Sequence, residues 1–71
     1  MQMNEKEIYE ICNQVDSFIA DKLVEAIIHK VSYETLEAHY GILPISRRSF
    51  YRKRKKAEQM MQENRNKTFL P

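Results

Sequence analysis

Apolar residues recur every three or four positions across residues 8–31, and no glycine or proline interrupts them. This spacing places them on one face of an α-helix. Asn4 and Glu7 precede the stretch in the arrangement of a capping box, so the helix is expected to begin there. The simplest interpretation is one long helix to about Lys30. The alternative is that Asp16-Ser17 caps a second helix and divides the stretch.

A shorter helix is expected next. Ser32 is a favourable N-cap, and Gly41 stands where a left-handed residue commonly ends a helix. These two residues frame a helix over residues 33–40. The side chains expected on its buried face are those of Tyr33, Leu36 and Tyr40.

A turn and a third helix complete the expected fold. Pro44 favours an extended conformation for the residue before it, so residues 41–45 are expected to form a turn. Ser46 then caps a helix that continues to about residue 64. Residues 65–71 show no periodicity and predict a flexible tail. The residues on the buried side of the third helix are Phe50, Ala57 and Met61.

These elements predict an all-α fold in which a long N-terminal helix packs on a helix-turn-helix. There are three helices, or four if the first is divided. Residues 1–64 form one domain, with the helix-turn-helix at about residues 32–64. A chain of 71 residues buries only about 60% of its unfolded surface, which leaves little material for an enclosed catalytic pocket. We therefore expect a binding protein and not an enzyme.

The residues with catalytic or metal-binding chemistry are few. Cys12 is the only cysteine, so no internal disulfide forms and a cytoplasmic location is expected. His29 and His39 do not combine with Cys12 in the spacing of a zinc site. Glu34 and Glu37 lack a partner nucleophile or base. No apolar run approaches the ~20 residues of a membrane span. We expect no metal, no cofactor and no membrane contact.

Charge is divided unevenly along the chain. Residues 1–46 contain three lysines and eight acidic residues, a net charge of −5. Residues 47–71 contain nine basic and two acidic residues, a net charge of +7. Seven of the twelve basic residues fall within the ten positions 47–56. Such a split favours a polyanionic partner at the C-terminal end.

The basic segment coincides with the start of the third helix, which makes double-stranded DNA the expected partner. The DNA major groove admits one helix, and the first turns of a reading helix lie closest to the base edges. Arg47 or Arg48 is expected to contact guanine, and the later basic residues to contact phosphates. At about 100° per residue, the side chains that point outward are those of Arg48, Tyr51, Arg52 and Lys55. The candidate DNA-binding residues are Ser46, Arg47, Arg48, Ser49, Tyr51, Arg52, Lys53, Lys55 and Lys56.

Residues 33–41, YETLEAHYG, and residues 45–52, ISRRSFYR, resemble a known helix-turn-helix. The pattern is that of sigma-factor region 4 and of small phage transcription activators of the ArpU and RinA types. Glu37 and the Leu43-Pro44 pair depart from it, since the family has a small residue at the first position and a shorter turn. The resemblance implies a recognition helix that begins at Ser46 and a phage-type or prophage-type transcriptional regulator. The residues that match the pattern's core and turn are Leu36, Tyr40, Phe50 and Gly41.

Several alternatives stay open. A recombination accessory factor of the excisionase kind would also use a helix-turn-helix with a basic face. A protein-interaction adaptor would bind RNA polymerase or another regulator through the acidic N-terminal helix. An RNA-binding module is less favoured, because the sequence lacks the exposed aromatic platform on which single strands stack. A last alternative is that the basic helix binds no partner and only keeps the domain soluble.

The N-terminal helix also predicts self-association. Its apolar stripe is larger than the rest of so short a chain can cover, so we expect a homodimer through this helix. Two-fold pairing would let two short recognition helices read a palindromic site. The residues expected at the dimer interface are Ile8, Ile11 and Val15.

Overall fold

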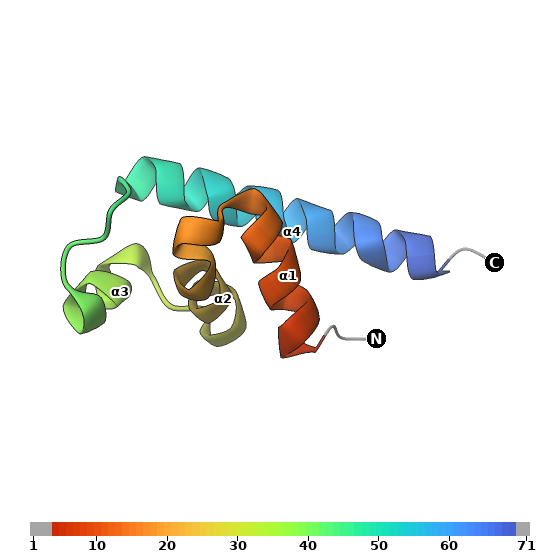
Figure 1. The fold of residues 1–71 in the computed structure, drawn as a ribbon, viewed down its shortest axis with the longest axis horizontal. Coiled ribbons are helices and arrows are strands. Elements are labelled where there is room, and N and C mark those ends of the chain that lie inside the picture. The colour runs from red at the N-terminus through yellow and green to blue at the C-terminus, as the bar shows by residue number, and fades with distance from the viewer. Residues whose placement is uncertain (1–3, 70–71) are drawn as a thin grey trace.

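The structure is a computed structural model that describes the backbone of residues 4–69 and the side chains of residues 4–63. This part of the chain contains four α-helices and one short 3-10 helix, and it contains no strand (Figure 1). The all-α prediction is confirmed, with the N-terminal stretch divided. In chain order the elements are α1 (Glu5–Val15), η1 (Ser17–Ile19), α2 (Ala20–His29), α3 (Tyr33–Tyr40) and α4 (Arg47–Phe69).

The N-terminal stretch breaks at Asp16, so the interpretation as one long helix is wrong and the divided alternative is right. The predicted capping box is present, because the Glu7 amide donates to Asn4 Oδ1 over 2.8 Å and the Asn4 amide donates to Glu7 Oε1 over 3.2 Å. Asp16 is extended, and its Oδ1 accepts a hydrogen bond from the Phe18 amide over 3.0 Å. This local cap prevails over the unbroken apolar periodicity. The chain turns back there, and α2 packs against α1.

Helix α3 has the bounds and caps predicted for the short helix over residues 33–40. Ser32 Oγ accepts a hydrogen bond from the Thr35 amide over 3.1 Å. Gly41 ends the helix with a φ of 84° and a ψ of −166°, so its φ is positive as predicted but its ψ lies outside the left-handed helical region. Only glycine adopts this conformation freely. Leu43 is buried in the connection that follows, which anchors it to the core.

The core lies between α1, α2 and α4, with α3 packed at one end. Phe50 and Ala57 of α4 are fully buried as predicted, whereas Met61 is only half-buried. Tyr40, predicted on the buried face of α3, is 52% exposed and donates a hydrogen bond to Glu25. The prediction for Tyr40 is therefore wrong. The largest fully buried side chains are those of Phe50, Leu23, Leu36 and Cys12.

The apolar patch predicted on the N-terminal helix is not exposed. Ile11 is only 8% exposed, and Ile8 and Val15 are half-buried against the core. The prediction assumed a long helix with too little chain to cover it. Because the chain turns back at Asp16, both α2 and α4 cover this face of α1. Ile11 is therefore covered within the chain itself, and a homodimer through this helix stays a prediction.

The molecule is elongated along α4. Figure 1 shows α1, α2 and α3 on one side of α4, whose C-terminal part extends past α1. The helix continues to Phe69, five residues beyond the predicted end at residue 64. The prediction of a flexible tail falls on residues whose side chains, and at 70–71 also the backbone, lie outside the described part of the chain. No helix among the described residues is both long and apolar enough to cross a bilayer.

Candidate nucleic-acid interface

The first turn of α4 begins as the sequence predicts. Ser46 Oγ accepts a hydrogen bond from the Ser49 amide over 3.2 Å and thus caps the helix. Phe50 faces the core, where its ring centroid lies 5.6 Å from that of Tyr33 and 5.7 Å from that of Tyr51. The buried Phe50 fixes the rotation of α4 about its axis, and so it decides which side chains of the basic run face away from the domain.

Two tyrosines join the start of α3 to α4. The Tyr33 amide, which has no partner within the first turn of its own helix, donates to Tyr51 Oη over 2.9 Å. Tyr33 Oη donates to the carbonyl oxygen of Ile45 over 2.6 Å. Burial raises the pKa of Tyr33 above its ordinary value of 10.0. The pair fixes the connection before α4 against α3.

Tyr51 therefore does not point outward as predicted. It is half-buried, and its hydroxyl oxygen accepts a hydrogen bond from the α3 backbone. Position 51 lies about 100° around the helix from the buried Phe50, on the side that α3 covers. The helical period alone placed it near the outer face, because the period does not show which flank a neighbouring helix occupies.

Lys53 and Arg54 of the basic run are bound by the domain itself. Lys53 Nζ lies 2.8 Å from Asp16 Oδ2, and the two side chains are 32% and 24% exposed. The hydrogen bond from Lys53 lowers the pKa of Asp16. Arg54 Nη1 donates to the carbonyl oxygen of Val31 over 3.4 Å, and its Nε lies 3.5 Å from Glu58 Oε2. Lys53, predicted as a phosphate anchor, is thus not a free cation.

Arg47 occupies an intermediate position. Its Nε lies 2.8 Å from Glu34 Oε2, but the two side chains are 67% and 56% exposed. Ion pairs that are so exposed contribute little and are screened by salt. The guanidinium also lies 5.8 Å from the ring centroid of Tyr51. Arg47 is therefore held by α3 in the free protein, although weakly.

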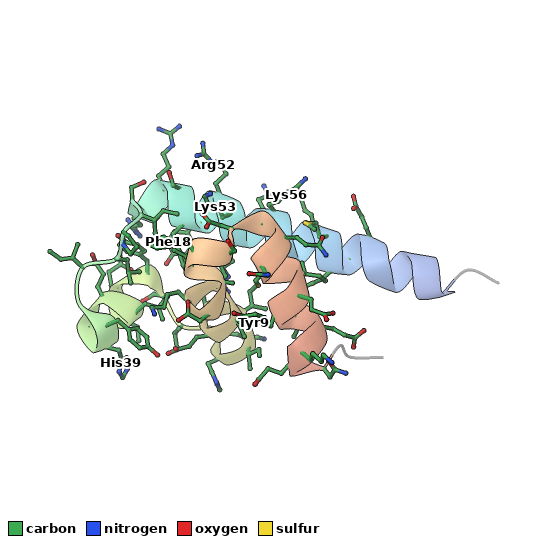
Figure 2. All side chains as sticks on the ribbon, in the orientation of Figure 1. Tyr9, Phe18, His39, Arg52, Lys53 and Lys56 are labelled. Carbon is green, nitrogen blue, oxygen red and sulfur yellow. The ribbon has the colours of Figure 1, made fainter. Side chains whose placement is uncertain are left out.

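Four basic side chains on α4 face away from the domain, and we call them the outer stripe: Arg48, Arg52, Lys55 and Lys56. All four are exposed, and none makes an ion pair with another described residue. At about 100° per residue, the four positions fall within an arc of about 100° around the helix axis. At 1.5 Å per residue they span about 12 Å along the axis. Figure 2 shows Arg52 and Lys56 pointing away from the other helices.

The structure thus separates the nine predicted residues into groups. The outer stripe holds four of them, Arg47 is held weakly, and Ser46 caps the helix. Ser49 is half-buried, and its Oγ lies 3.5 Å from Arg52 Nη2. Tyr51 and Lys53 make contacts within the domain. The candidate site therefore contains fewer residues than the basic run.

Phe18 is a surface residue that the sequence did not reveal. Its place in the apolar periodicity predicted burial on the N-terminal helix, yet it is 77% exposed in η1. The break at Asp16 changes the direction of the chain before Phe18 is reached. The Asp16-Ser17 capping signal indicated the break but not the direction that the chain takes after it.

Comparison with known proteins assigns the chain to no family. No protein-family model, curated protein or solved structure matches the chain. The resemblance of residues 33–52 to the sigma-factor and phage-activator helix-turn-helix stays a prediction. Among the described residues, no group of three or more His, Cys, Asp or Glu side chains is arranged to hold a metal ion. The functional inference rests on the charge and geometry of the outer stripe.

Proposed function

We propose that the protein binds double-stranded DNA through α4 as a sequence-specific regulator of transcription. The observation that carries the proposal is the outer stripe, in which four exposed cationic side chains share one face of a helix. The other helices lie on the opposite side of α4 and leave this face open (Figure 1). A helix of about 10–12 Å diameter fits a major groove about 12 Å wide. Phosphates on both edges of the groove are then within reach of long basic side chains.

Position along α4 separates reading from anchoring. Arg48 lies in the first turn, where a recognition helix comes closest to the base edges, and its guanidinium suits a bidentate contact to guanine. Lys55 and Lys56 lie two turns later and are suited to phosphate contacts, which do not depend on sequence. Arg52 lies between them. Discrimination is therefore assigned to the start of the stripe and affinity to its end.

Further partners stay predictions. A recombination accessory factor would need the same duplex-binding face, so the outer stripe alone does not distinguish it from a transcriptional regulator. A contact to RNA polymerase is compatible with exposed acidic residues on α1, such as Glu5 and Glu10. Pairing of two copies on a palindromic site would rest on the half-buried Ile8 and Val15 or on another surface, because Ile11 is buried.

Two matched pairs of lysines test the proposal. Lys55 and Lys56 lie in the outer stripe, whereas Lys6 on α1 and Lys30 after α2 are exposed elsewhere. The K55Q/K56Q and K6Q/K30Q variants lose the same net charge. Fluorescence anisotropy should show that the wild type prefers duplex to single-stranded DNA. The K55Q/K56Q variant should bind more weakly, with a salt slope reduced by about two, and K6Q/K30Q should bind like the wild type.

Two outcomes would contradict the proposal. Equal losses in the two lysine variants would mean that net charge alone drives binding and that α4 has no special part in it. Absence of duplex binding by the folded wild type at low salt would remove the proposal altogether, since electrostatic attraction to phosphates is strongest there.

A further inference from the structure

Phe18 is an aromatic side chain that the fold leaves exposed in η1, two residues after Asp16, which pairs with Lys53 of α4. Its exposed fraction is 77%, whereas the next two residues, Ile19 and Ala20, are 2% and 0% exposed. The buried neighbours anchor η1 in the core, so the outward direction of Phe18 is set by the fold. Single exposed apolar residues are common on proteins. The position of Phe18, and not its exposure, is therefore the informative observation.

One carboxylate ties Phe18 to α4. Asp16 Oδ1 accepts a hydrogen bond from the Phe18 amide over 3.0 Å, and Asp16 Oδ2 accepts one from Lys53 Nζ over 2.8 Å. In Figure 2, Tyr9 lies away from α4 along α1. Lys53 is adjacent in the chain to Arg52, and it lies one helical turn from Lys56. Phe18 is thus linked through Asp16 to Lys53, on the flank of α4 that adjoins the outer stripe.

The width of the DNA groove determines what this flank would meet. A recognition helix fills the major groove, so elements beside the helix come against the sugar-phosphate backbone that borders it. Deoxyribose presents apolar C–H surface between the phosphates. Asp16 already neutralises Lys53, and therefore this flank offers the backbone an aromatic ring next to a paired charge.

We infer that Phe18 is a second DNA contact, packing against the deoxyribose of the backbone strand that borders the groove occupied by α4. The inference rests on the proposed function of α4 and adds an apolar contact to it. Such a contact releases no phosphate counterions, so it raises affinity without changing the salt dependence. Basic residues of the outer stripe change both quantities. This difference makes the two kinds of contact separable by experiment.

The test compares Phe18→Ala with Tyr9→Ala in duplex binding across a salt series. Tyr9 is also an exposed aromatic residue, but it lies on α1 away from α4. Phe18→Ala should weaken duplex binding about tenfold, as expected if about half of the ring is covered on binding. Its salt slope should equal that of the wild type. Phe18→Leu should recover most of the affinity, and Tyr9→Ala should bind like the wild type.

The outcomes distinguish this inference from the function on which it rests. Failure of the wild type to bind duplex DNA would overturn the proposed function. Wild-type binding that Phe18→Ala leaves unchanged would overturn only the role of Phe18, and so would an equal loss in Tyr9→Ala. A weaker complex with a smaller salt slope would also overturn it, since that result means displaced basic side chains. A change in sedimentation without a change in DNA affinity would instead place Phe18 between copies of the chain.

Discussion

The basic run at the start of α4 has two parts that the sequence does not separate. Lys53 and Arg54 are bound to other parts of the domain, and Arg47 is held by Glu34. The outer stripe is free of such ion pairs within the described residues. Of the seven basic residues in the run, four therefore remain available to a partner. A count of charges overstates the charge that a binding surface offers.

The division follows from the position of Phe50. Lys53 and Arg54 follow it by three and four residues, so they lie on the same face of α4 and reach the rest of the domain. The outer stripe lies opposite. One set of basic side chains on α4 thus contacts the rest of the domain, and the other set faces solvent. Variants that remove single members of each set test whether the two sets have different roles.

The largest effect is expected from the residue that orients both sets. Phe50 is fully buried, and Phe50→Ala should cost about 3–5 kcal/mol of folding free energy. That loss is comparable with the total stability of a small domain, so the variant should be largely unfolded by circular dichroism. Phe18→Ala is the control and should melt like the wild type. A Phe50→Ala variant with wild-type stability would mean that this residue does not set the orientation of α4.

The next effect separates Arg48 from its neighbour Arg47. Arg48→Ala should cost about 1–3 kcal/mol of binding to a site selected from random duplexes, and it should relax discrimination at one base pair. Arg47→Ala should cost less, because Arg47 is engaged by Glu34 in the free protein. Competition between base-substituted duplexes measures both quantities. If Arg47→Ala lost base discrimination and Arg48→Ala kept it, the base contact would belong to Arg47 and not to Arg48.

A smaller effect compares two lysines of the same run. Lys56→Ala should lower the salt slope of duplex binding by about one, as loss of one phosphate contact does. Lys53→Ala should leave the slope unchanged and should instead destabilise the fold, because it leaves Asp16 without its partner. Salt titrations and thermal melts of both variants provide the measurement. The comparison fails if Lys53→Ala lowers the slope as much as Lys56→Ala does.

The smallest effect concerns pH and the Asp16–Lys53 pair. The hydrogen bond from Lys53 lowers the pKa of Asp16 from its ordinary value of 3.8. A carboxyl whose pKa is lower in the folded state stabilises the fold above its unfolded pKa and loses this effect as the pH falls through the folded value. Thermal melts should therefore decline below pH 3.8, with a weaker decline in Asp16→Asn. Identical acid limbs in both proteins would show that the pair has no net effect.

Local signals in the sequence predicted much of the fold. The capping box at Asn4 and the caps at Ser32 and Ser46 have the predicted hydrogen bonds. Each of these contacts joins residues three positions apart and is therefore visible as spacing. The break at Asp16 was one of two interpretations, because a cap and an unbroken apolar stripe favoured different structures at one place.

The remaining features of the candidate site depend on contacts between distant residues. Lys53 pairs with Asp16, which is 37 residues away, and Tyr51 meets Tyr33, which is 18 residues away. Helical periodicity shows which residues share a face but not which flank another helix covers. For the same reason the exposure of Phe18 follows from the direction of the chain after Asp16, which no local pattern specifies.

The salt dependence of duplex binding by the wild-type protein measures how many basic side chains of α4 contact phosphates. Each phosphate neutralised contributes about −0.9 to the slope of log affinity against log salt. The outer stripe therefore predicts a slope of about −4. A slope near zero would remove the electrostatic basis of DNA binding. A slope of about −6 would mean that all seven basic residues of the run contact phosphates, and it would contradict the division of α4 into bound and available cations.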